Sequence, residues 1–276
     1  MRTTSLLVLI VCVDAMFIAS FPSPIHLDLA NAQQNNTLMQ SQGDQSMTTN
    51  PNNVTIVLVH GVWVDGSSWS KVIPTLQNAG YRVIAVQLPL QSLSDDVATV
   101  KRTIDLAGGP VILVGHSYGG FVITNAAYNN PNVKGLVYIA AFAPNEGQSL
   151  NNFVDPAKLP KVVDSAGFVY IKPENFRQLF AQDIDPTETK VMAATQKPAN
   201  QAIFTEKSGP PAWKQIRSWY QVSENDHAIP PEAERTFAKQ INATTISVTS
   251  SHASPVSHPN EVAKLILDAA NNSTIG

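Results

Sequence analysis

The stretch that decides the fold is PVILVGHSYGGFVITNAAYNN, residues 110–130. Its apolar run, residues 111–114, is typical of a buried strand, and the amphipathic segment after the pentapeptide GHSYG is typical of a helix. The pentapeptide, residues 115–119, fits G-x-S-x-G, in which the serine stands on a tight, strained turn that exposes its hydroxyl group. The pattern therefore predicts that Ser117 is a nucleophile. A glycine-rich helix start with an ordinary exposed serine is the alternative.

Short apolar runs and amphipathic segments alternate on both sides of this stretch. Such alternation indicates an α/β fold with a mostly parallel sheet of about six strands, covered by helices on both faces. Right-handed crossovers then place the carboxyl ends of the strands at one edge, where ligands bind. Strands are predicted at 55–61, 82–90, 110–117, 135–144, 216–223 and 244–251, and helices at 67–80, 92–108, 118–130, 230–241 and 260–270.

Residues 145–211 interrupt this alternation. They contain several prolines, scattered Phe and Lys, and helical pieces such as ENFRQLFAQDI, residues 174–184. We predict that residues 145–211, here called the cap, form a helical insertion over the active-site edge of the sheet. The core of the domain, 54–276, would then consist of residues 54–144 and 212–276.

The first residues have the composition of a targeting segment. Arg2 precedes an apolar run, residues 6–13, that is too short for a membrane span. We predict a signal peptide over residues 1–32, cleaved after the small residues 30–32 or near Ser20; an uncleaved anchor is the alternative. The protein is therefore expected to be secreted or extracytoplasmic, without stable membrane insertion after the signal is removed.

A polar segment separates the predicted signal from the domain. Residues 33–53 are rich in Gln, Asn, Ser and Thr, so burial cannot offset the entropy of ordering them, and we predict a flexible linker. The only cysteine, Cys12, lies in the predicted signal. A mature chain without it excludes a cysteine nucleophile, a thiolate metal site and a disulfide framework.

Charge and motifs limit the partners. The net charge is −3 and the isoelectric point about 6.0, which gives no basic field for nucleic acid or an anionic membrane. A small neutral molecule is the expected partner. The sequence has no H-E-x-x-H motif and no G-x-G-x-x-G after a strand, so we predict no cofactor and no metal.

A serine nucleophile needs a base, which in a sheet of this kind follows the acid in the chain. His252 comes directly after the predicted strand 244–251, where the sheet edge would place it over Ser117. We predict that His252 is the base, with His258 as the alternative.

The orienting acid is expected after the preceding strand, 216–223. Asp226 lies in the loop that follows this strand, and Glu224 lies closer to the strand itself. We predict that Asp226 accepts the N–H of His252 and stabilises the imidazolium, with Glu224 as the alternative.

Two backbone donors are needed for the oxyanion that forms during acyl transfer. The N–H of Tyr118, directly after the nucleophile, is one candidate, and the N–H of Val62, in the loop after the first strand, is the other. Trp63, Tyr118, Phe142 and apolar cap residues are predicted to line an apolar substrate pocket. The alternative is that these aromatic side chains only pack the cap onto the core.

The quoted motifs resemble a known group. The segments VLVHGVWVDGSSWSKVIPTLQNAGYRVIAVQLP, VILVGHSYGG, SENDHAIPPE and SSHASPVSHP are similar to bacterial-type α/β-hydrolases related to plant salicylate methyl esterases and hydroxynitrile lyases. The resemblance covers residues 55 to about 270. It implies the α/β-hydrolase fold, and the group's triad and oxyanion donors fall on Ser117, Asp226 and His252, and on Val62 and Tyr118.

Two departures favour the esterase branch. The lyases carry Thr where this chain has Gly61, and Lys where it has Ala253. We therefore predict a serine esterase that cleaves small carboxylic esters through an acyl-enzyme. Hydrolysis of a lactone or an activated amide is the first alternative, since the same groups serve it. A small-molecule-binding protein with a vestigial triad is the second.

Overall fold

The computed structural model of the chain describes residues 53–273. The predicted signal peptide (1–32) and the predicted linker (33–53), except its last residue, lie outside the described residues. Within the described part, no helix has both the length and the apolar character that a membrane crossing requires.

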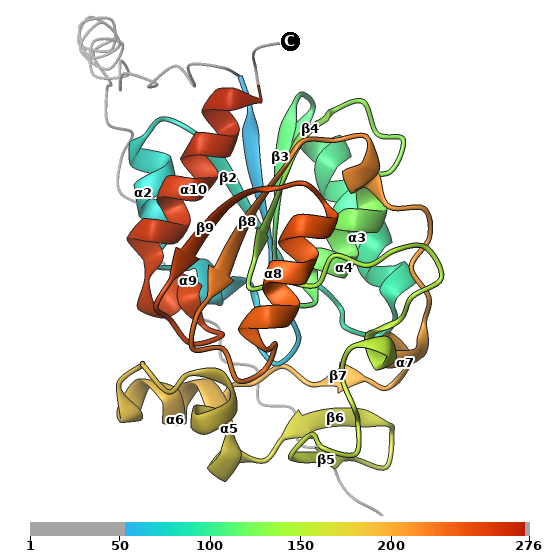
Figure 1. Cartoon of the computed structure of the whole chain (residues 1–276), viewed down its shortest axis with the longest axis vertical. Helices are drawn as coiled ribbons and strands as arrows, with labels where there is room; N and C mark the ends of the chain where they lie inside the picture. The colour runs from blue at the N-terminus through green and yellow to red at the C-terminus, as the bar shows by residue number, and fades with distance from the viewer. Residues whose placement is uncertain (1–52, 274–276) are drawn as a thin grey trace, which may run out of the picture. The chain divides into compact units, whose positions relative to one another are not determined.

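The core of the domain is a six-stranded sheet in the order β2-β1-β3-β4-β8-β9. Every neighbouring pair in it is parallel, which confirms the predicted fold class (Figure 1). Strands β1 and β3 are buried along their whole length, so they form continuous apolar runs rather than alternating patterns. The strands are β1 (Thr55–Val59), β2 (Arg82–Val86), β3 (Val111–His116), β4 (Val133–Ile139), β8 (Ser218–Ser223) and β9 (Thr244–Val248).

Helices cover both faces of this sheet. The helices α2 (Ile73–Asn78) and α10 (Pro259–Asn272) bury one apolar cluster against it, and α3 (Leu93–Ala107), α4 (Gly119–Ala126) and α8 (Pro231–Gln240) bury the other. A short helix, α9 (Ser254–Ser257), precedes α10.

One predicted helix, 67–80, is wrong in its extent. The chain forms the 3-10 helix η1 (Gly66–Trp69) and then, after a break, the short helix α2. Pro74 lies in the first turn of α2, where its missing N–H is tolerated but where a longer helix could not run through it.

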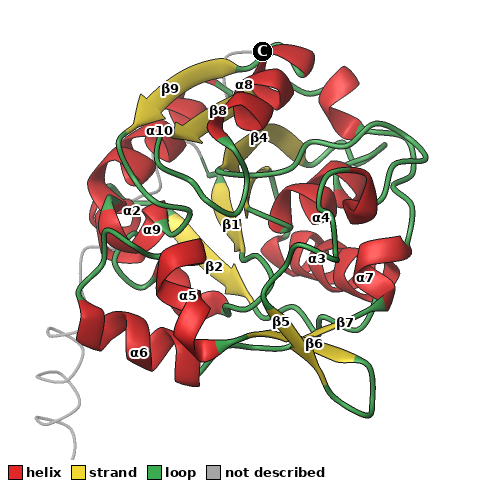
Figure 2. Ribbon diagram, turned by 60° about the horizontal axis from the view of Figure 1, so that its bottom comes forward, coloured by secondary structure: helices red, strands yellow, loops and turns green. Residues whose placement is uncertain are grey.

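The cap contains more than helices. Its helices are α5 (Pro173–Phe180), α6 (Pro186–Ala194), α7 (Ala202–Thr205) and the 3-10 helix η2 (Leu150–Asn152). It also holds a three-stranded antiparallel sheet of β5 (Lys161–Val163), β6 (Phe168–Ile171) and β7 (Ala199–Asn200) (Figure 2). The 3-10 helix η3 (Ala212–Lys214) then leads back into the core. We keep 145–211 as the proposed extent of the cap.

The small sheet in the cap has a sequence signal that the prediction of a helical cap overlooked. Strands β5 and β6 are rich in Val, Tyr and Ile and flank the turn residues 164–167. The Asp164 carboxylate accepts the backbone N–H groups of Ala166 and Phe168, and Gly167 has a φ of 83°. β-Branched and aromatic runs around such a turn are typical of a hairpin.

Candidate active site

Ser117 stands on a strained turn between β3 and α4. Its φ is 55°, in the left-handed region that residues other than glycine rarely adopt. The surrounding backbone holds it there: its N–H donates to the Ile139 carbonyl (3.2 Å), and its carbonyl accepts the N–H groups of Gly120 (3.0 Å) and Phe142 (3.2 Å). The turn exposes the hydroxyl group of Ser117 to a cavity at the carboxyl edge of the sheet.

Glycines around the turn allow unusually close approach. A β-carbon on Gly119 would lie 2.5 Å from the Val59 carbonyl oxygen, so only glycine lets α4 start so close to β1. A β-carbon on Gly61 would lie 2.7 Å from the β-carbon of Ser117. The loop after β1 therefore reaches Ser117 with its backbone, as an oxyanion-binding loop must.

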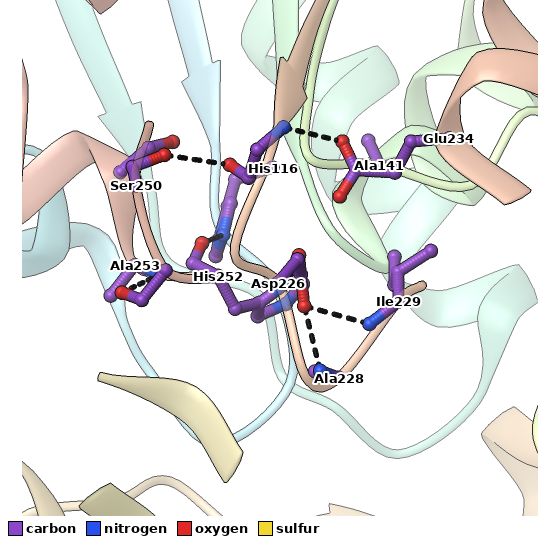
Figure 3. A network of polar contacts seen from close by, with 12 residues as sticks. His116, Ala141, Asp226, Ala228, Ile229, Glu234, Ser250, His252 and Ala253 are labelled. Carbon is purple, nitrogen blue, oxygen red and sulfur yellow. Dashed lines mark hydrogen bonds and ion pairs between the residues drawn. The ribbon is translucent and has the colours of Figure 1, made fainter. Parts of the chain in front are cut away.

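His252 and Asp226 form a buried pair beside this turn. The Nδ1–H of His252 donates to Asp226 Oδ2 over 2.5 Å, and both side chains are almost completely buried (Figure 3). His252 lies in the loop after β9, and Asp226 in the loop after β8. His252 and Ser117 line the same cavity. No direct hydrogen bond joins these two side chains among the described residues; catalytic contacts of this kind are often long without substrate.

The environment of Asp226 favours its charged form. Burial alone would raise the pKa of its carboxyl group, but the imidazole of His252 and several hydrogen bonds outweigh burial and lower the pKa. Two of these bonds come from the backbone N–H groups of Ala228 (2.6 Å) and Ile229 (2.8 Å), which both donate to Oδ1 (Figure 3). Asp226 is thus a fixed carboxylate that orients the His252 ring and fixes its tautomer.

The two predicted oxyanion donors have free backbone N–H groups. Within residues 53–273, no hydrogen bond uses the N–H of Val62 or of Tyr118. Both residues line the cavity of Ser117. Buried backbone N–H groups are nearly always paired, so two free ones beside a candidate nucleophile point to a ligand oxygen as their partner.

A buried contact that sequence reasoning missed fixes Tyr118. Its hydroxyl group donates to Asp96 Oδ2 over 2.8 Å, while Asp96 Oδ1 accepts the N–H of Leu90 over 2.9 Å. Burial raises the pKa of Asp96 to about 6 and keeps the pKa of Tyr118 well above its usual value. Asp96 follows Asp95 in the first turn of α3, where acidic residues are common, so nothing in the sequence indicates that Asp96 is buried.

The cavity around Ser117 is small and apolar. Its volume is about 30 Å³, room for little more than a water molecule. Trp63 and Phe142, the predicted pocket residues, both line it. They also pack against aromatic residues, Trp63 against Phe204 of the cap and Phe142 against Phe121, so the two interpretations of these rings are compatible. The other apolar lining residues are Leu150, Val154, Leu159, Leu179, Phe204, Ala228 and Ile229.

The alternative triad residues lie elsewhere. Glu224 pairs with Arg235, and the pKa of its carboxyl group is lowered chiefly by a hydrogen bond with Ser247. His258 Nδ1 lies 3.7 Å from Asp183 Oδ2. Neither alternative lines the cavity of Ser117.

Two further histidines near the turn make structural contacts. Both ring nitrogens of His60 bond the backbone: Nδ1 donates to the Gly61 carbonyl and Nε2 accepts the Leu88 N–H. The Nε2 of His116 donates to the carbonyl oxygen of His252 over 2.8 Å. Burial lowers the pKa of His60 to about 4 and that of His116 to about 3, so both rings are neutral at pH 7.

A second carboxyl group, Glu234 on α8, was also missed. It is fully buried close to Asp226, and its Oε2 accepts the backbone N–H of Ser223. In the sequence it is one of several charged residues on an amphipathic helix, which gave no reason to place it in the core. As for metals, the described residues contain no group of three or more His, Cys, Asp or Glu side chains that could hold an ion.

The sequence matches a known protein family and several known hydrolases. Residues 56–265 match the Alpha/beta hydrolase family. The chain is 38% identical over 129 residues to a carbendazim hydrolyzing esterase from Nocardioides sp., which is 41% of this chain and 51% of that protein. It is 28% identical over 251 residues to a pyrethroid hydrolase from Sphingobium wenxiniae, covering 78% of this chain and 87% of that protein.

Solved structures show the same fold. One is an extracellular alpha/beta-hydrolase from a Paenibacillus species, described as sharing structural and functional homology with tobacco Salicylic Acid Binding Protein 2. It superposes with a TM-score of 0.69 at 22% identity, over 78% of this chain and 98% of that chain.

Proposed function

Because this chain belongs to the Alpha/beta hydrolase family, we propose that it hydrolyses small carboxylic esters through an acyl-enzyme on Ser117. The family and the esterase and hydrolase names of its relatives confirm the resemblance and identify the chain as a carboxylic ester hydrolase. The observation that carries the triad proposal is the imidazole of His252, which is bonded to the buried Asp226 carboxylate and lines the cavity of Ser117.

The proposed reaction uses the tautomer that this hydrogen bond fixes. His252 holds its proton on Nδ1, so Nε2 is free to accept the proton of the Ser117 hydroxyl group as Oγ attacks the ester carbonyl. The N–H groups of Val62 and Tyr118 then donate to the oxyanion of the tetrahedral intermediate. His252 returns its proton to the leaving alcohol, and a water activated by the same ring releases the acid.

The character of the cavity supports an uncharged substrate. Apart from Ser117 and His252, its lining side chains are apolar or aromatic, so a charged acyl or alcohol group would lose hydration without a partner. A volume of about 30 Å³ is far below the several hundred Å³ of typical ligand sites. Cap residues such as Leu159, Leu179 and Phe204 must therefore move for an ester to enter.

The test is hydrolysis of short-chain p-nitrophenyl esters by the mature chain. Ser117→Ala should abolish turnover, and Asp226→Asn should lower kcat by about 10⁴-fold, because the amide no longer selects the correct tautomer of His252. The matched control is Glu224→Gln, on the same loop but outside the cavity, which should keep wild-type activity. Turnover that survives in Ser117→Ala would overturn the proposal.

The alternatives separate in the same assay. Lactones and activated amides would use the same groups, and their kcat/KM relative to the esters ranks the bond types. A binding protein with a vestigial triad would bind an ester without releasing p-nitrophenol in the wild-type chain.

A further inference from the structure

Glu234 is a buried neighbour of Asp226, which pairs with His252. It is on α8, its side chain is fully buried, and its Oε2 accepts the backbone N–H of Ser223 over 2.9 Å. Its other oxygen, Oε1, is buried and receives no hydrogen bond from any donor in the described part of the chain. Figure 3 shows Glu234 in the same network as Asp226 and His252.

The contact between Glu234 and Asp226 has a chemical requirement. The two carboxyl groups lie close together in the buried core, and Oε1 of Glu234 has no donor beside it, yet two carboxylates have only acceptors and repel each other. A hydrogen bond between them exists only if one carries a proton. Asp226 already accepts from His252, Ala228 and Ile229, which favours its charged form. The proton therefore belongs on Glu234.

We propose that Glu234 is a permanently protonated positioning residue that donates a hydrogen bond to Asp226 and so extends the triad by a fourth member. The inference rests on the proposed function for its catalytic role, but not for its protonation. Oε1–H helps to hold the Asp226 carboxylate in place. It also adds no second negative charge beside the imidazole.

The ionisable groups around Glu234 agree with this assignment. Burial, followed by the charge of Asp226, raises the pKa of Glu234 well above neutral, and Glu224 adds to the effect. Tyr220 is also buried nearby, and its pKa is raised chiefly by burial, so it stays neutral. Arg235, the next residue, points to Glu224 and Glu232 and does not neutralise Glu234.

The first test measures protonation and needs no substrate. If Glu234 is protonated in the folded state and ionised in the unfolded chain, folding takes up one proton above the ordinary glutamate pKa, and stability falls as pH rises. Glu234→Gln keeps one acceptor for Ser223 and one donor for Asp226 but cannot ionise. In urea unfolding from pH 6 to pH 9, the folding equilibrium constant of Glu234→Gln relative to wild type should rise about tenfold per pH unit.

The matched control is Glu232→Gln, two residues earlier on α8, where the side chain is 86% exposed. Its folding constant relative to wild type should not change with pH. If the folding constant of Glu234→Gln relative to wild type is also independent of pH, Glu234 is ionised in the folded protein. That result would overturn the proposal, whatever the activity.

The second test measures the positioning role. Glu234→Gln should keep the wild-type kcat and the acidic limb of the kcat/KM profile, because the donor to Asp226 is retained and no charge is lost. Glu234→Leu should fold, as its thermal transition will show, but lower kcat about tenfold to a hundredfold, because Asp226 loses a charge-assisted hydrogen bond. Wild-type kcat in Glu234→Leu, or an acidic limb shifted to lower pH in Glu234→Gln, would contradict it.

Discussion

The strained conformation of Ser117 depends on single residues that leave room for it. Gly61 is the clearest case, since a β-carbon there would lie 2.7 Å from that of Ser117. Gly61→Ala should therefore displace the serine or the oxyanion loop and lower kcat/KM about a hundredfold, a loss typical of a 1 Å misplacement. The control is Gly109→Ala, where the nearest atom would lie 3.9 Å away. Equal activity in both variants would show that the loop tolerates the extra carbon.

A second prediction for a single side chain concerns Asp96, and it is tested by the stability of the protein rather than by its activity. Burial raises its pKa to about 6, so the folded state holds a proton that the unfolded chain has released between about pH 4 and pH 6. The wild-type protein therefore loses stability as the pH rises through this window. Asp96→Asn has no carboxyl group at this position and does not lose it. The stability of Asp96→Asn relative to wild type should rise by about 3 kcal/mol across the window and stay level above it.

Urea unfolding at pH 4, 5, 6 and 7 measures this difference, with Asp95→Asn, exposed on the same turn of α3, as the control. A difference for Asp96→Asn that does not change between pH 4 and pH 6 would show that Asp96 ionises normally.

Among single residues, those whose place is set by neighbours in the chain were predictable. Ser117 and Tyr118 stand where a strand, a turn and a helix start meet in the sequence, and Val62 follows the first strand; the structure places all three at one cavity, and their roles stay predictions. Asp96 and Glu234 were not predictable. Each is one acidic residue on an amphipathic helix, and only the packing of α3 and α8 onto the sheet decides that these carboxyl groups are buried.

At the scale of elements, the cap lines the cavity of Ser117, and we expect it to select which esters enter. Phe204 on α7 lines the cavity of Ser117 and also a second cavity of about 210 Å³, which lies within the cap. Leu159 is shared in the same way. Leu159 and Phe204 therefore lie between the small cavity of Ser117 and the larger cavity in the cap.

Phe204→Ala should join the two cavities. The ratio of kcat/KM for a p-nitrophenyl ester with a long acyl chain to that for the acetate should rise about tenfold or more, because the longer chain gains apolar burial. Val163→Ala, on an exposed part of β5 outside both cavities, is the control and should leave the ratio unchanged. An unchanged ratio in Phe204→Ala would mean that the second cavity takes no part in binding.

The elements of the core were easier to predict than those of the cap. Strands β1 and β3 are fully buried and give continuous apolar runs, and the alternation of strands and helices on either side of them made all six strands expected. The short strands of the cap, three or four residues long in β5 and β6, are only half-buried and give a weak pattern. The predicted helix 67–80 was too long because Pro74 lies in the first turn of α2, so the residues before α2 form the separate 3-10 helix η1.

For the whole molecule, we propose that the chain is exported and then acts outside the cytoplasm. The proposal is supported by Arg2 and the short apolar run over residues 6–13, which are typical of a signal peptide. After expression of the full chain in a bacterial host, N-terminal sequencing of the protein outside the cytoplasm should place the first residue between about 20 and 33. A chain that stays in the cytoplasm with Met1 in place would contradict it.

The central claim concerns a covalent bond on Ser117, and trapping that bond tests it most directly. The wild-type chain, mixed with p-nitrophenyl acetate and quenched in acid within the first turnovers, is digested and analysed by mass spectrometry. The account predicts one acetyl group on the peptide that contains Ser117, and none in Ser117→Ala. Steady release of p-nitrophenol with no acetylated peptide, or with the acetyl group on another residue, would contradict it.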